Sequence, residues 1–123
     1  MIRVFLVDDQ ETVRQGLHMR LLLEPDITVV GEARNGREAL SLAQVLHPDV
    51  ILMDIEMPEM DGIMATSAIR AALPQSAIVI LSIHDDRMTR MQAQMAGAVA
   101  FVEKRGKTET LLTAIRQAAH DTP

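Results

Sequence analysis

Hydrophobic residues gather in five short runs of four to six positions along the chain. Two of the runs, 50–53 and 78–81, are apolar without alternation, as is typical of strands covered on both faces of a parallel sheet. The run that starts at Ile27 becomes polar at its end, which indicates an edge strand. The pattern predicts strands at Ile2–Val7, Ile27–Val30, Val50–Met53, Ala77–Leu81 and Val99–Val102.

Between these runs, hydrophobic residues recur every three or four positions and predict five amphipathic helices. Gly16 interrupts the first helix at a cost of about 1 kcal/mol relative to Ala, so we expect close packing around it. The helix faces are Val13, Leu17 and Leu21; Ala39, Leu42, Ala43 and Leu46; Ala65, Ile69, Ala72 and Leu73; Met88, Met91 and Met95; and Leu111, Leu112, Ile115 and Ala119. The expected helix boundaries are Asn35-Gly36, Pro48, Pro74, Gly97 and, as an N-cap, Thr108.

Strands that alternate with helices through short loops favour parallel pairing with right-handed crossovers. The chain of 123 residues therefore predicts one α/β domain, an open parallel sheet with helices on both faces. In such sheets, ligands bind beyond the carboxyl ends of the strands.

Composition narrows the function classes. The absence of Cys excludes disulfide scaffolds, thiolate catalysis and zinc ribbons, and 48% hydrophobic residues with 24% charged residues indicate a globular domain. A net charge of −5 and 2% aromatic residues argue against direct nucleic-acid binding by this domain. No apolar run approaches ~18 residues and the start does not resemble a signal peptide, so we expect no membrane association and a cytoplasmic location.

Polar residues follow the predicted strands at the edge where a ligand would bind. Asp8 and Asp9 follow the first strand, Asp54 the third, Ser82 the fourth and Lys104 the fifth. Two carboxylates ~5 Å apart repel by about 3 kcal/mol at an effective dielectric of 20, so three of them would retain a proton or bind a cation. An all-oxygen site suits Mg²⁺, and a carboxylate beside Mg²⁺ can attack a phosphoryl group. Asp54, at the end of a central strand, is the expected nucleophile.

Taken together, these elements resemble the receiver domain of response regulators, of the CheY-like kind and most like the NarL/FixJ-type two-component regulators. The resemblance implies a doubly wound, flavodoxin-like (βα)5 three-layer sandwich with strand order 2-1-3-4-5. It implies a receiver domain over residues 1–119, followed at 120–123 by the start of a linker or C-terminal tail. The residues that carry it are Val7-Asp8-Asp9, Asp54-Ile55-Glu56-Met57-Pro58 with Gly62, Leu81-Ser82 and Phe101-Val102-Glu103-Lys104.

The resemblance also implies a role for each site residue. Asp54 would accept a phosphoryl group from a sensor histidine kinase. Mg²⁺ would be held by Asp9 and Asp54, by Asp8 mainly through water, and by the backbone carbonyl of Glu56. Ser82 and Lys104 would contact the phosphoryl group, and Phe101 would change its rotamer as Ser82 moves.

The implied activity is that of a switch rather than an enzyme, since it would catalyse only its own phosphorylation and dephosphorylation. Its output would be transcription, through homodimerisation on phosphorylation or through a DNA-binding domain absent from this chain; we expect the chain to be part of a longer regulator. Three positions depart from the common pattern. Arg105 replaces a proline, Ile83 replaces a small residue, and Phe101 lacks the hydroxyl of the commoner tyrosine.

Simpler interpretations exist for the individual residues. Asp8 and Asp9 could cap the first helix, and Lys104 alone would be a surface charge. Met88, Met91 and Met95 are expected to form a packing stripe; the alternative is a soft surface for partners.

Two other functions share parts of the pattern. Asp54-Ile55-Glu56 superficially resembles the nucleophile motif of haloacid-dehalogenase-type phosphatases, although their nucleophile lies on the first strand. A flavodoxin-type module would have the same layers, but the acidic segment Asp8-Asp9-Gln10-Glu11 would repel a flavin phosphate.

Overall fold

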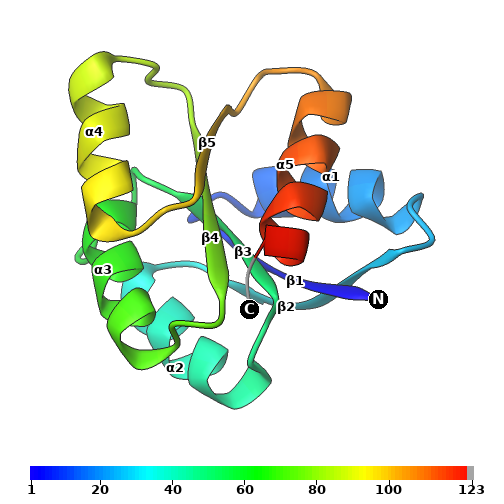
Figure 1. Ribbon diagram of the computed structural model, residues 1–123, viewed down its shortest axis with the longest axis horizontal. Coiled ribbons are helices and arrows are strands. Elements are labelled where there is room, and N and C mark those ends of the chain that lie inside the picture. The colour runs from blue at the N-terminus through cyan, green and yellow to red at the C-terminus, as the bar shows by residue number, and fades with distance from the viewer. Residues whose placement is uncertain (122–123) are drawn as a thin grey trace.

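Strands and helices alternate throughout residues 1–121, the part of the chain that the computed structural model describes (Figure 1). The strands form one parallel sheet in the order β2-β1-β3-β4-β5, and helices cover both of its faces. This is the predicted doubly wound, flavodoxin-like three-layer sandwich. The elements are β1 Ile2–Val7, α1 Glu11–Leu22, β2 Ile27–Ala33, α2 Gly36–Leu46, β3 Val50–Asp54, α3 Gly62–Ala72, β4 Ala77–Ser82, α4 Arg87–Ala96, β5 Ala100–Glu103 and α5 Thr108–Asp121.

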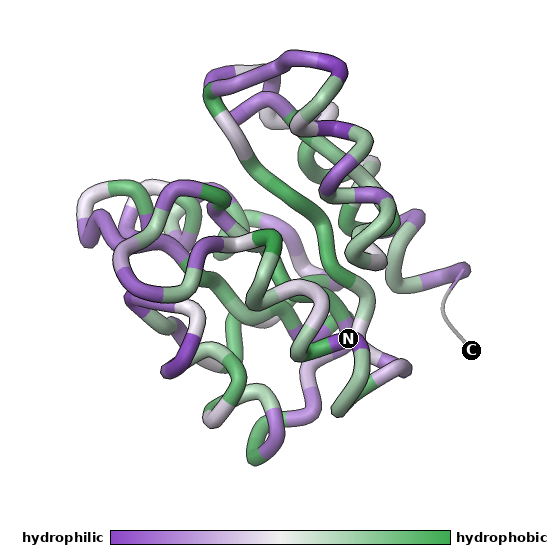
Figure 2. Tube along the Cα trace, turned by 90° about the vertical axis from the view of Figure 1, so that its left-hand side faces the viewer, coloured by the Kyte–Doolittle hydropathy of each residue, from purple (hydrophilic) through white to green (hydrophobic). Residues whose placement is uncertain are grey.

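The two faces of the sheet form two separate cores. One core packs under α1 and α5 and includes Leu21 and Ile115; the other packs under α2, α3 and α4 and includes Ile69. Every residue of β3 and β4 is buried, which explains why their sequences do not alternate. Figure 2 shows hydrophobic residues along the strand segments that run between the helical layers. The sheet is therefore a rigid support for whatever its strand ends carry.

The predicted strands are all present, with shifted ends. β2, β3 and β4 continue to Ala33, Asp54 and Ser82, whereas β5 begins one residue later than predicted, at Ala100. Hydrophobicity ends before the backbone ladder does, because the last residues of these strands are polar or small. Asp54 and Ser82 thus belong to the sheet itself.

The first helix differs from its predicted face. Its buried residues are Arg14, Leu17 and Leu21, while Val13 is only half-buried. The prediction of close packing around Gly16 is wrong, because no atom outside its own helix and neighbours lies within 4 Å of where a Cβ would stand.

The methionine stripe of α4 is also corrected. Met88, Met91 and Met95 are 65%, 47% and 82% exposed, and the buried residue of this helix is Ala93. Ala93 packs into the core under α2, α3 and α4, and the longer thioether side chains lie on the exposed face of the helix. The packing interpretation of the stripe is therefore wrong.

The predicted helix ends are mostly confirmed. Asn35 caps α2 by accepting a hydrogen bond from the Glu38 amide at 2.8 Å, and Gly97 ends α4 with a φ of 112°. Thr108 is the first residue of α5 rather than its N-cap, since the Leu111 amide bonds to the carbonyl of Lys107. α5 continues through Asp121, into the segment predicted as a tail, and residues 122–123 lie outside the described part. Among residues 1–121, no helix has the length and apolarity needed to cross a membrane.

Candidate functional site

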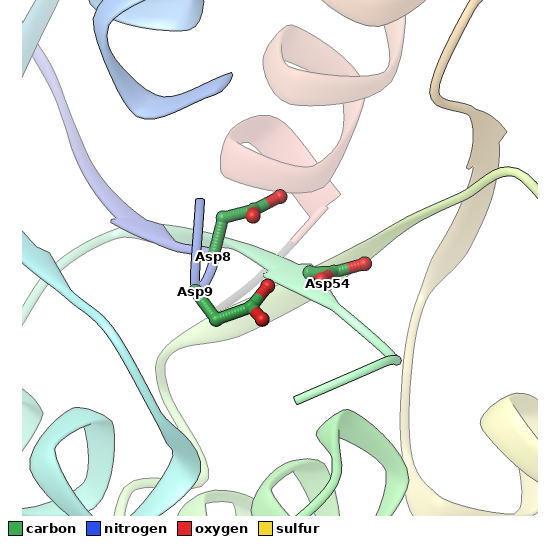
Figure 3. A group of neighbouring side chains, drawn as sticks. All are labelled: Asp8, Asp9 and Asp54. Atoms are coloured by element: carbon green, nitrogen blue, oxygen red, sulfur yellow. The ribbon is translucent and has the colours of Figure 1, made fainter. Parts of the chain in front are cut away.

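Three carboxylates meet where β1 and β3 end. Val7 pairs with Met53 in the ladder between these central strands, so the next residues, Asp8 and Asp54, lie side by side. One carboxylate oxygen of each of Asp8, Asp9 and Asp54 lies within 4.8 Å of the others. Figure 3 shows the three side chains turned to the same side of the strand ends. The expected convergence of the acids is therefore present.

Lys104 joins this acidic cluster from the loop after β5. Its Nζ lies 2.6 Å from Asp8 Oδ2 and 3.4 Å from Asp54 Oδ1. Its backbone amide donates to the carbonyl of Ser82 at 2.9 Å, which fixes the loop against the end of β4. Burial opposes the charge of Lys104, but its hydrogen bonds and proximity to the two carboxylates outweigh burial and place its pKa above the ordinary value. Lys104 is thus a charged partner of the acids and not a solvated surface lysine.

One ammonium does not neutralise three carboxylates. Asp8 and Asp54 are only 2% and 6% exposed, whereas Asp9 is exposed. Burial, together with the negative charge of Asp8, raises the pKa of Asp54 to about 6, although Lys104 acts in the opposite direction. The cluster thus has excess negative charge and an all-oxygen donor set, which fits Mg²⁺.

Ser82 and Glu56 lie on the wall of the same cleft, whose volume is about 560 Å³. Ser82 ends β4, directly after Leu81, which is the ladder partner of Asp54. Ser82 is buried, and its Oγ accepts a hydrogen bond from the His84 amide at 3.0 Å. The carboxylate of Glu56 contacts the Nε2 atom of His84. Ile83 and Arg105, two of the departures from the common pattern, also line the cleft.

Phe101 lies apart from the cleft wall. Phe101 is on β5, where it pairs with Ile80 of β4; it is half-buried and packs against the core under α2, α3 and α4. The guanidinium of Arg90 on α4 covers its ring, 4.6 Å from the ring centroid, and Arg90 also pairs with Asp85. Phe101 is thus separated from the acids by β4, with its outer side covered by α4.

The loop after Asp54 depends on one glycine. Gly62 donates its amide to the Ile55 carbonyl at 2.9 Å, and a Cβ at Gly62 would stand 2.0 Å from the backbone oxygen of Asp54. Only glycine permits this approach. Gly62, which the sequence analysis grouped with the Asp54 motif, therefore lets α3 begin directly against the backbone of Asp54.

The capping interpretation of Asp8 and Asp9 is wrong. The N-cap residue of α1 is Gln10, and it makes no side-chain cap. The Asp8 carboxylate instead accepts from the Gln10 amide at 2.9 Å, ahead of the helix. That bond holds the turn in which both acids lie.

Sequence reasoning missed Arg14. This buried residue of α1 donates to the backbone carbonyl of Asp8 at 2.6 Å and to the Glu32 carboxylate at 3.0 Å. The signal in the sequence was its spacing, three residues before Leu17 and seven before Leu21, which places an arginine on the buried face.

Comparison with protein families gives one match, which covers most of the chain. The sequence profile of the response regulator receiver domain matches residues 4–116. Among curated proteins, the chain is 45% identical over 125 residues to the transcriptional regulatory protein LiaR of Bacillus subtilis, covering all of this chain and 58% of that protein. It is 37% identical over 116 residues to the nitrate/nitrite response regulator protein NarL of Escherichia coli, covering 94% of this chain and 54% of that protein. The chain thus spans little more than half the length of these relatives.

A solved structure shows the same fold over its full length. The signal receiver domain of the response regulator NarL from Mycobacterium tuberculosis superposes with a TM-score of 0.92 at 35% identity, covering 98% of this chain and 97% of that one.

Proposed function

Since this chain belongs to the response regulator receiver domain family, we propose that Asp54 accepts a phosphoryl group from a phosphohistidine of a sensor histidine kinase. The observation that carries this proposal is the contact of Lys104 with both Asp8 and Asp54 in a cluster that keeps excess negative charge. A carboxylate among other carboxylates repels a phosphoryl group unless cations offset the negative charge. The excess negative charge of the cluster would attract such a cation.

The residues that would hold Mg²⁺ are Asp9 and Asp54, with Asp8 mainly through water and the backbone carbonyl of Glu56. When bound, Mg²⁺ supplies the positive charge that offsets the repulsion between carboxylates and phosphoryl oxygens. All three acids and Glu56 lie at the carboxyl ends of two central strands, so their positions are set by the sheet.

In the transfer, a carboxylate oxygen of Asp54 forms the new bond to phosphorus while the bond from phosphorus to the histidine nitrogen breaks. The electron pair of that bond leaves with the imidazole nitrogen. Lys104 would pair with a phosphoryl oxygen, and the hydroxyl of Ser82 would donate a hydrogen bond to another. Lys104 already contacts Asp54, and Ser82 lines the same cleft.

The proposed switch runs from Ser82 to Phe101. When Ser82 turns toward the phosphoryl group, it vacates space beside β5 into which the Phe101 ring can rotate. The rotation would free Arg90 from the ring and alter the outer face of α4 and β5. We assign residues 1–119 to the receiver domain, and propose that its output is transcription, through a homodimer or a DNA-binding domain in a longer chain.

This role differs from that of a turnover enzyme. The chain would accept one phosphoryl group and lose it again, so its chemistry acts on itself. The phosphatase and flavin-binding alternatives find no support. The receiver-domain profile matches residues 4–116, and the segment after β1 contains Asp8, Asp9 and Glu11, which would repel a flavin phosphate.

The test is phosphorylation by acetyl phosphate or a phosphorylated histidine kinase in the presence of Mg²⁺. Intact-mass spectrometry should show one added phosphoryl group on the wild type and none on Asp54→Asn. The matched control, Asp121→Asn, changes an exposed carboxylate on α5 and should be phosphorylated normally. Phosphorylation of the Asp54→Asn variant to the wild-type extent would contradict the assignment.

A further inference from the structure

Arg14 is a buried cation to which the proposed phosphoryl transfer gives no task. Its side chain is 10% exposed, on the face of α1 that packs against the sheet. Its Nη1 donates to the backbone carbonyl of Asp8 at 2.6 Å, and its Nε donates to Glu32 Oε1 at 3.0 Å. One guanidinium therefore joins α1, the end of β1 and the edge strand β2.

Burying a guanidinium is costly unless its donors are paired and its charge is balanced. Glu32 supplies the balancing charge from β2, and His18 Nδ1 faces the same carboxylate at 3.7 Å. The other partner, the Asp8 carbonyl, lies where β1 has just ended. An apolar residue at position 14 would fill the same space without these bonds, so packing alone does not account for an arginine.

The Asp8 carbonyl belongs to the peptide plane that connects Asp8 to Asp9. Because a peptide unit is rigid and planar, fixing its oxygen fixes the direction in which the chain enters Asp9. The carboxylate of Asp8 is held separately, by Lys104 and by the Gln10 amide. The backbone and the side chain of Asp8 are thus held by different partners, which oppose the mutual repulsion of the acids.

We propose that Arg14 and Glu32 form a positioning pair that holds the Asp8–Asp9 turn in the geometry required for divalent-cation binding. The inference rests on the proposed function, since it concerns the same acids. Arginine suits the task because its planar fork carries donors in two fixed directions, whereas a lysine ammonium is a single point on a flexible stem.

The experiment compares Mg²⁺ affinity in the variants Arg14→Met, Arg14→Lys and Glu32→Gln, measured by NMR titration of the purified chain. Partners that orient metal ligands typically change affinity by roughly 10- to 100-fold, and we expect a loss in this range for Arg14→Met. Arg14→Lys should rescue little of it, and Glu32→Gln should cause a smaller loss in the same direction.

The matched control is Arg116→Met. Arg116 also joins a helix to a neighbouring segment through acids: its Nε lies 2.9 Å from Asp26 Oδ2 and its Nη2 lies 2.7 Å from Glu24 Oε1. These two acids precede β2, at the end of that strand opposite to Glu32. A purely structural role for Arg14 would make the two methionine variants behave alike. We expect Arg116→Met to bind Mg²⁺ with wild-type affinity.

The geometry of the Asp8–Asp9 turn can also be tested in the absence of metal. Hydrogen exchange of the Gln10 amide, which donates to the Asp8 carboxylate, should be faster in Arg14→Lys and Glu32→Gln and unchanged in Arg116→Met. If Arg14→Met fails to fold, these two variants carry the test.

Wild-type affinity and wild-type exchange in folded Arg14 and Glu32 variants would overturn the positioning role while leaving the proposed function intact. Failure of the wild type itself to bind Mg²⁺ or to become phosphorylated would instead overturn the proposed function.

Discussion

Asp54 illustrates how position changes the chemistry of a single residue. It is an ordinary aspartate in sequence, yet it ends a fully buried strand next to Asp8, and its pKa rises to about 6 from an ordinary value of 3.8. Ionising Asp54 destabilises the folded state alone, because in the unfolded chain the two acids are separated and hydrated. Asp54 therefore links the stability of the fold to pH.

This linkage predicts the behaviour of Asp54→Asn in metal-free buffer. In the wild type, the folded state binds the Asp54 proton more tightly than the unfolded state does. The stability that this proton adds to the fold is fully present below about pH 4 and is lost as the pH rises through about 6. At pH 7.5 the variant should therefore be more stable than the wild type by about 3 kcal/mol. Urea unfolding followed by far-UV circular dichroism measures the difference. The two proteins should converge near pH 4, and a less stable variant at pH 7.5 would contradict the prediction.

At the residue scale, the sequence was sufficient to predict which acids converge, because the ends of parallel strands share one edge of the sheet. It could not reveal the task of Arg14. A charged residue on a helix is normally solvent-exposed, and only the three-dimensional course of β2 brings Glu32 within its reach.

At the scale of elements, two glycines of helices have opposite surroundings. Gly62 begins α3 against the backbone of Asp54, whereas Gly16 in the middle of α1 has open space around it. The same substitution should therefore have opposite effects on stability at the two positions.

We expect Gly62→Ala to lower the free energy of unfolding by about 1–3 kcal/mol, because a Cβ would displace the Asp54 backbone. We expect Gly16→Ala to raise it by about 1 kcal/mol through helix propensity alone. Chemical denaturation monitored by circular dichroism tests both, and each variant is the control for the other. Equal effects of the same sign would show that the space around the two glycines does not decide the outcome.

The elements themselves were predictable because hydrophobic periodicity differs between buried strands and amphipathic helices. Which face of a helix is exposed was harder to predict. Periodicity at Met88, Met91 and Met95 indicated a buried stripe, yet α4 turns Ala93 toward the sheet and leaves the methionines outside. Hydrophobic periodicity shows that a helix has an apolar face, but not whether that face packs inside the domain.

For the whole molecule, the parallel sheet separates two cores and carries the acidic cluster at one end. This arrangement could be predicted from the alternation of strands and helices, and the strand order from the resemblance to receiver domains. It also makes ligand binding a property of the entire fold, because the acids are assembled only when β1 and β3 pair.

Binding of Mg²⁺ should therefore stabilise the whole domain. At about ten times its dissociation constant, the ion should add about 1.4 kcal/mol to the free energy of unfolding, as for any ligand that binds only the folded state. Thermal unfolding with Mg²⁺, and with sodium chloride at matched ionic strength, measures the gain. Asp9→Asn should remove most of it, and an equal gain from sodium chloride would show that general screening is responsible.

The contact of Lys104 with Asp8 and Asp54 has a consequence for the sheet edge. Lys104 follows directly on β5, the last strand, while the acids belong to strands in the middle. Lys104 is a counter-ion that the protein itself supplies to these carboxylates. A cation that competes for the same oxygens would weaken these contacts, so we expect the edge of the sheet after β5 to respond to binding at its centre.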